Sequence, residues 1–202
     1  MVGRDSRTVM AYCGQLVEEG WLRQLPNGRR VRPVATIPKG VEEAIAEETH
    51  DLISMTPYWG EECTWRFVDW IVAPYVRFVR HARPDLLRNP KTGYRLEYDI
   101  YAPSVCWAVE YYGDQHFAPT SQYPDETEFI ERHKRDLQKA SLSEQNDIRL
   151  SIVTKSDLTL KRVLSTVPDD VPRSTFNLDG PYVSMLERVG NAVKGGRTWD
   201  RE

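Results

Sequence analysis

The 202-residue chain contains no apolar run of the roughly 18 residues that a membrane-spanning helix requires. No signal-peptide pattern stands at its start, so the sequence predicts a cytoplasmic protein that contacts no membrane. Cysteine is also scarce, and Cys13, Cys63 and Cys106 lie far apart without forming a Cys-x-x-Cys pair. We therefore expect buried thiols in a reducing compartment, and neither disulfides nor a zinc site. Sequence repeats and low-complexity segments are absent as well.

The chain also lacks the excess of positive charge that is usual in nucleic-acid-binding proteins, because its net charge is −3. The charges are, however, unevenly distributed. Residues 1–40 carry seven Lys/Arg against three Asp/Glu, residues 41–76 one against eight, and residues 77–95 six against one. Since local patches bind phosphates, the sum over the whole chain decides little.

Two strands are expected in the middle of the chain, each carrying a carboxylate. Apolar and polar side chains alternate over residues 94–101, and the alternation resumes over residues 107–112 after a break at Pro103. If these strands pair as a hairpin, Asp99 and Glu110 approach each other on one face. Neighbouring carboxylates repel unless a cation lies between them, so the pattern favours a divalent metal ion.

The order of Asp99, Glu110 and the sequence Tyr-Tyr-Gly-Asp-Gln-His at 111–116 resembles the core of the PD-(D/E)XK nuclease superfamily. It is most similar to the branch with Glu-x-Asp-Gly-x-x-His, which includes very-short-patch-repair-like and homing-endonuclease-like proteins. The similarity continues through Arg-Asp-Leu-Gln-Lys at 135–139 and the strand that follows, and it covers roughly residues 60–165.

This resemblance implies a restriction-endonuclease-like α/β (α+β) fold, a mixed β-sheet flanked by helices, over residues 41–202. It also implies a DNA endonuclease that depends on Mg²⁺, with Mn²⁺ as an alternative ion. In the family's arrangement, Asp99, Glu110 and the main-chain carbonyl of Tyr111 would hold the metal. The ion would lower the pKa of its bound water and take up charge on the leaving oxygen.

The site departs from the superfamily at Tyr112, which stands where a lysine is usual and where the similar branch has aspartate. The water-activating role would then fall to Lys139, His116 or Gln115. The family also places an acidic residue near the start of the preceding helix. Glu62, three residues before Trp65, fits that spacing better than Glu61, although both could simply complement the positive helix N-terminus.

Residues 1–40 resemble the recognition helix and wing of a winged helix-turn-helix domain. A helix is predicted over 5–20, and residues 21–25 and 29–37 flank Pro-Asn-Gly, a strong hairpin signal. The two helices that normally precede such a unit are missing. Either the chain is part of a longer protein, or the unit only packs against the nuclease-like core. The basic side chains expected to contact DNA phosphates are Arg7, Arg23, Arg29, Arg30 and Arg32 here, and Arg83, Arg88 and Lys91 before the Asp99 strand.

Periodicity predicts the remaining elements. Helices are expected over residues 41–54, 61–78, 128–144, 156–164 and 181–194, and a strand over 148–153 parallel to the Glu110 strand. The side chains expected to be buried are Val41, Ala44, Ile45, His50 and Leu52 in the first helix, Phe129, Ile130, Leu137 and Ala140 in the third, and Tyr182, Met185, Leu186 and Val189 in the last.

Two functions of different class follow. The first is a Mg²⁺-dependent DNA endonuclease with an N-terminal DNA-binding element, acting alone, as a homodimer or within a larger protein. The second is a catalytically inactive nuclease-fold protein that binds DNA or serves in assembly, having lost its chemistry at Tyr112.

Overall fold

The computed structural model describes residues 23–24, 30–31, 39–118, 125–174 and 177–196. It divides the chain into two compact units, Met1–Pro38 with Thr175–Asn177, and Lys39–Ser174 with Leu178–Glu202. In the first unit, β1 (Arg23–Gln24) pairs antiparallel with β2 (Arg30–Val31). This is the pairing that the Pro-Asn-Gly turn signal predicts. The helix expected over 5–20, and Arg7, Arg29 and Arg32, lie outside the described residues.

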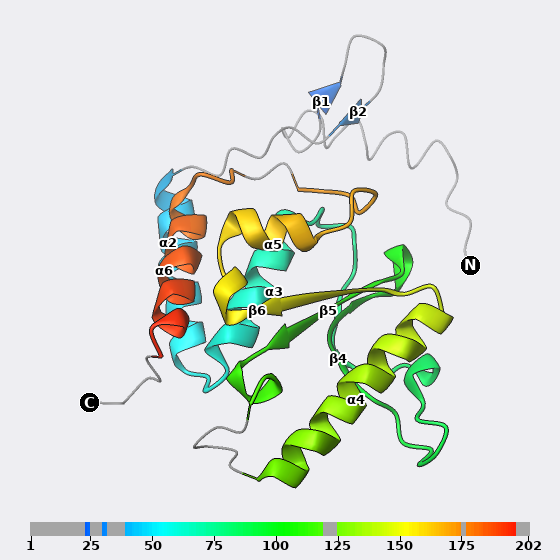
Figure 1. The fold of residues 1–202 in the computed structure, drawn as a ribbon. Coiled ribbons are helices and arrows are strands. Elements are labelled where there is room, and N and C mark those ends of the chain that lie inside the picture. Colours follow the sequence, from blue (N-terminus) through cyan, green and yellow to red (C-terminus); the bar gives the residue numbers. More distant parts are fainter. Residues whose placement is uncertain (1–22, 25–29, 32–38, 119–124, 175–176, 197–202) are drawn as a thin grey trace. The chain divides into compact units, whose positions relative to one another are not determined.

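The second unit is built on a four-stranded mixed sheet of order β3-β4-β5-β6 (Figure 1). Its strands are β3 (Val79–Ala82), β4 (Tyr98–Ala102), β5 (Trp107–Tyr112) and β6 (Arg149–Thr154). The first three are antiparallel neighbours, whereas β5 and β6 run parallel because a helix returns the chain between them. The predicted β5–β6 pairing and the mixed α+β class are thus confirmed.

The β4–β5 hairpin sets the position of the two central carboxylates. Ile100 lies opposite Val109, so the next step of the register places Asp99 opposite Glu110. The connection is a short 3₁₀ turn, Pro103–Val105, that ends at Cys106 in a left-handed conformation with a φ of 48°. Cys106 is therefore exposed, and the expectation of a buried thiol there was wrong, whereas Cys63 is buried as predicted.

The helices cover both faces of the sheet (Figure 1). They are α2 (Lys39–Ser54), α3 (Trp59–Ile71), α4 (Glu126–Gln145), α5 (Leu160–Thr166) and α6 (Pro181–Lys194). Gly60 of α3 abuts the ring of Tyr111, and Lys139 of α4 contacts Glu110. Because adjacent strand residues point to opposite faces, α3 and α4 pack on opposite sides of β5. Among the described helices none has the length and apolarity to cross a membrane.

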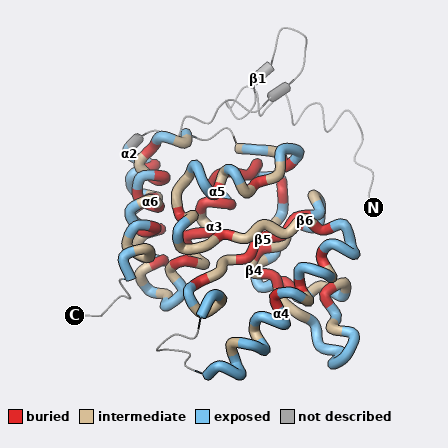
Figure 2. Tube along the Cα trace, in the orientation of Figure 1, coloured by how far each residue is buried: buried red, intermediate tan, exposed pale blue. Residues whose placement is uncertain are grey.

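Two helices turn an unexpected side inward (Figure 2). In α2 the buried residues are Glu42, Ala46, Thr49 and Ile53, whereas Val41 and Leu52 are about half exposed. The predicted face was wrong because Glu42 accepts a hydrogen bond, 3.2 Å long, from the main-chain N–H of Tyr182 in the first turn of α6. A carboxylate there complements the positive helix N-terminus.

In α4 the buried residues are polar, namely Asp136, Lys139 and Ser143. Ile130 and Leu137, which were expected inside, are 46% and 61% exposed. The apolar-face prediction fails here because the polar residues have partners on the sheet side. Helix α6 is different: its bounds and its buried face match the prediction, since the side chains that it buries are mostly apolar.

The remaining differences are local. The helix expected over 61–78 ends at Ile71, well before Pro74, and β3 follows where only a basic loop was predicted. The helix expected over 156–164 is a short 3₁₀ turn, Lys155–Asp157, followed by α5. The 3₁₀ turn is capped by reciprocal bonds between Thr154 and Asp157.

Candidate active site

A cleft of about 1360 Å³ opens beside the β4–β5 hairpin. Its walls come from the start of α3, the segment around Glu97, the residues that follow β5 and the inner side of α4. The cleft lies entirely within the second unit. Of the residues predicted to be functional, Asp99, Glu110, Tyr111, Gln115, His116 and Lys139 all belong to its lining.

Asp99 and Glu110 lie side by side, as the sequence predicted. The N–H of Tyr111 donates to Asp99 Oδ2 at 2.8 Å, and the N–H of Asp99 donates to Glu110 Oε1 at 3.3 Å. Burial, followed by the neighbouring Asp99 carboxylate, raises the pKa of Glu110 to about 8, against the opposing effect of Lys139. Burial also raises the pKa of Asp99. Burial therefore outweighs the positive charge that lies near these two carboxyl groups.

Lys139 supplies a cation from the helix. Its Nζ donates to Glu110 Oε2, and both side chains are almost completely buried. Because Lys139 and Asp136 are three residues apart on α4, one helix face brings a lysine and a carboxylate to the same cleft. The buried lysine accounts for the polar inner face of α4.

His116 forms a second pair on the same wall. Its Nδ1 lies 2.8 Å from Asp136 Oδ2, with side-chain exposures of 15% and 11%. A carboxylate can only accept, so Nδ1 is the donor when Asp136 is ionised, and Nε2 lies outside this hydrogen bond. The ring of Tyr112 stacks on His116 with centroids 4.2 Å apart and planes 7° apart. Stack and hydrogen bond together fix the orientation of the imidazole.

Gln115 is held by its main chain, whose carbonyl accepts from Arg132 Nη1 at 2.9 Å. Its side-chain oxygen lies against Gly113, where an added Cβ would come within 2.5 Å of it. Gln115 thus lines the cleft. Among the contacts of the described residues, it has no hydrogen bond to Asp99 or Glu110.

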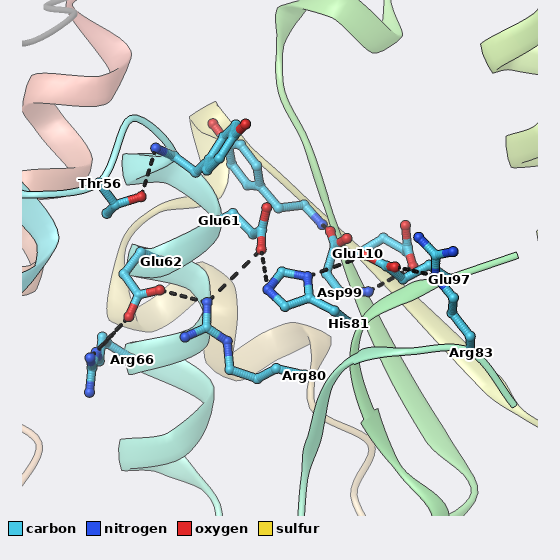
Figure 3. A network of polar contacts seen from close by, with 12 residues as sticks. Thr56, Glu61, Glu62, Arg66, Arg80, His81, Arg83, Glu97, Asp99 and Glu110 are labelled. Atoms are coloured by element: carbon cyan, nitrogen blue, oxygen red, sulfur yellow. Dashed lines mark hydrogen bonds and ion pairs between the residues drawn. The ribbon is translucent and has the colours of Figure 1, made fainter.

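The structure places Glu61, and not Glu62, on the cleft (Figure 3). Burial first, and then the Asp99 carboxylate, raise the pKa of Glu61. Glu62 instead contacts Arg66 at 3.0 Å and Arg80 at 2.6 Å. The spacing argument favoured Glu62, but successive residues of a helix point about 100° apart, and of the two only Glu61 lines the cleft.

His81 contacts two carboxylates that line the cleft, and this was not predicted from the sequence. Its Nε2 lies 3.6 Å from Glu61 and its Nδ1 lies 3.3 Å from Glu97 (Figure 3). His81 has a φ of 50°, a conformation that non-glycine residues adopt at a cost of about 1–3 kcal/mol. No pattern could have identified it, since β3 itself was not predicted.

Two of the basic residues expected to follow DNA are engaged within the protein. Arg83 pairs with Glu97 at 2.6 Å, and Arg88 pairs with Asp85 at 2.8 Å. Arg83 lines the cleft, whereas Arg88 and the exposed Lys91 do not. Arg23 and Arg30 lie in the two strands of the first unit.

The donor set fits a magnesium-type ion better than a transition metal. The part of the chain that the structure describes contains no cluster of three or more His, Cys, Asp or Glu suited to a metal. Mg²⁺ does not need such a cluster, because it commonly binds one or two carboxylates and keeps several waters. Asp99 and Glu110 offer two carboxylates, and Tyr111, whose main-chain carbonyl was expected to join them, directly follows Glu110 in sequence.

Comparisons with known proteins give relatives without a stated activity. The chain is 35% identical over 114 residues to uncharacterized protein 307L of invertebrate iridescent virus 6, a match covering 52% of each protein. It is 54% identical over 37 residues to uncharacterized protein 033L of invertebrate iridescent virus 3, or 18% of this chain and 19% of that protein. The chain thus spans about half the length of protein 307L and about a fifth of the length of protein 033L. No protein-family model and no solved structure matches it.

The raised pKa of Glu110 predicts a stability that depends on pH. Between the ordinary value of 4.5 and about 8, the folded metal-free protein keeps a proton that the unfolded chain has lost. The free energy of unfolding should therefore fall as pH rises through this window, by at most about 1.4 kcal/mol per pH unit from this group. Glu110→Gln should flatten the decline in urea-unfolding curves, and the exposed Glu47→Gln should not. Parallel curves for wild type and Glu110→Gln would contradict this.

Proposed function

We propose that this protein is a metal-dependent DNA endonuclease of the PD-(D/E)XK type, with a restriction-endonuclease-like core. The observation that carries the proposal is the meeting of Asp99, Glu110 and Lys139 at one point of the cleft. Strand β5 has Tyr112 where the superfamily has its lysine. In this protein Lys139 of α4 supplies a lysine instead, and its Nζ contacts Glu110. The order of an antiparallel hairpin, a helix and a parallel strand supports the same assignment.

The residues present fit a divalent ion. Asp99 and Glu110 would hold it. Burial is the main cause of the raised pKa of both carboxyls, and for Glu110 the neighbouring Asp99 carboxylate adds to it. When bound, Mg²⁺ lowers the pKa of a coordinated water and neutralises charge on the leaving oxygen.

The side chains around the carboxylates have distinct parts in this proposal. Lys139 donates to Glu110 and so orients it, and its positive charge favours the phosphate that enters the cleft. His116, held by Asp136, presents Nε2 as a base or, once protonated, as an acid. Glu61 lines the cleft from α3, and its pKa is raised by burial and then by the neighbouring Asp99 carboxylate.

Tyr112 favours a second candidate function. With Tyr112 stacked on His116, the strand position of the usual lysine holds a ring with no charge to offer an attacking water. A protein that keeps the fold but only binds DNA, or takes part in assembly, would tolerate this residue. The two functions differ in a single observable, which is metal-dependent cleavage.

A cleavage assay tests the proposal. In Mg²⁺ or Mn²⁺, the wild type should cut at least one of single-stranded, duplex or branched DNA. Asp99→Asn and Glu110→Gln should each abolish cleavage, because each removes a carboxylate ligand while keeping the shape of the side chain. Glutamine is preferred to alanine at 110, since the buried Lys139 would otherwise lose its partner. His116→Ala should slow the reaction by about 10²- to 10⁴-fold.

The matched control is Asp114→Asn, which changes a carboxylate of the same cleft that pairs with Lys155 at its exposed edge. It should cleave at nearly the wild-type rate. DNA binding measured in Ca²⁺ or EDTA should survive in Asp99→Asn and Glu110→Gln. A wild type that cleaves no DNA, or a Glu110→Gln variant with full activity, would favour the non-enzymatic candidate.

The basic hairpin of the first unit is proposed to bind duplex DNA without taking part in the chemistry. Replacing both Arg29 and Arg30 by alanine should weaken duplex binding and make the slope of log K against log salt shallower by about 1.8, for two lost phosphate contacts. The exposed Lys161→Ala on α5 serves as the charge control. Unchanged affinity and slope in the double variant would mean that the hairpin is structural.

A further inference from the structure

The mouth of the cleft carries two large apolar side chains that the proposed chemistry does not use. Met55 and Tyr58 lie in the connection between α2 and α3, line the cleft, and are 74% and 65% exposed. Exposed apolar side chains beside a polar site often mark a binding surface. Here they stand next to a reaction centre, so the molecule bound there must offer an apolar face.

Tyr58 is held by a rigid part of the molecule. Its N–H donates to Thr56 Oγ1 at 3.1 Å, and α3 begins at the next residue. Gly60 packs so closely on β5 that an added Cβ would lie 2.0 Å from Cζ of Tyr111. Because the N–H of Tyr111 bonds Asp99, the start of α3 and the central carboxylates are fixed to the same strand. The backbone of Tyr58 is therefore positioned beside the centre before any ligand arrives.

The charges of the lining make phosphate attraction alone a weak source of affinity. Among the described residues, the lining contains six carboxylates and five Lys or Arg side chains. Arg83 is paired with Glu97, and Lys155 with Asp114. A cleft whose carboxylates outnumber its Lys and Arg side chains gains little from releasing counterions of a phosphate backbone. Another part of the nucleic acid must contribute, and its bases are the part with apolar faces.

We propose that the cleft takes an unpaired DNA strand and that the ring of Tyr58 stacks on one of its bases, with Met55 beside it. This inference rests on the proposed nuclease function. In a duplex, the faces of the bases are covered by the neighbouring pairs, so the Tyr58 ring meets a base only where the strand is unstacked. Stacking on an aromatic side chain is tolerant of sequence, since every base has a π-face.

The test measures binding in EDTA by fluorescence anisotropy, so that cleavage has no influence on it. The probes are a mixed-sequence single strand, its duplex, and an abasic strand of equal length. Tyr58→Ala should weaken single-strand binding at least about five-fold and leave the duplex and the abasic strand unaffected. Tyr58→Trp should restore the affinity. The control Tyr75→Ala changes a tyrosine of similar exposure, 68%, that lies outside the lining, and it should bind as the wild type does.

Equal weakening for all three probes, an unchanged single-strand affinity in Tyr58→Ala, or no rescue by tryptophan would overturn the inference. These outcomes are separate from failure of the proposed function. If Tyr58-dependent binding is found without any cleavage, the single-strand site stands and the nuclease proposal falls. If cleavage is found while Tyr58→Ala binds single strands normally, the reverse holds.

Discussion

The buried contact in which Lys139 Nζ donates to Glu110 Oε2 is the interaction on which the centre of this protein depends. Burying a lysine and a carboxyl group is costly, and the cost is offset only when the partners lie close and their other polar atoms are hydrogen-bonded. Glu110 meets this condition through Lys139 and the N–H of Asp99. The pair also fixes how α4 lies on the sheet, because Lys139 must face inward.

That constraint explains where sequence reasoning succeeded and where it failed. Strands β5 and β6 and helix α6 followed from alternation and periodicity, since most of their buried residues are apolar. In α4 the same reasoning placed Ile130 and Leu137 inside, although both are exposed. Periodicity identifies a helix whichever side is buried, but it assigns the buried side by apolarity alone. A helix that brings Lys139 and Asp136 to a site breaks that assumption.

The members of the site were predictable to different degrees. Asp99, Glu110, His116 and Lys139 came from motif order, and the structure brings all four to one cleft. Glu61 was weighed against Glu62 and rejected, because helix rotation cannot be determined from one apolar neighbour. No sequence pattern indicated His81. It is itself the left-handed residue of β3, and that backbone conformation depends on tertiary contacts. The basic residues were recognised as a patch, but the acids that pair with Arg83 and Arg88 were not.

Whether Asp99 and Glu110 form a metal site is tested most directly by calorimetric titration with Mn²⁺ at about pH 7. The titration is carried out in two buffers of different ionisation enthalpy, so that proton release is measured as well as binding. Because burial and Asp99 raise the pKa of Glu110 to about 8, ion binding must displace its proton. The wild type should bind a single ion and release close to one proton, and Glu110→Gln should bind far more weakly and release none. No binding by the wild type, or equal affinity and proton release in Glu110→Gln, would contradict the assignment.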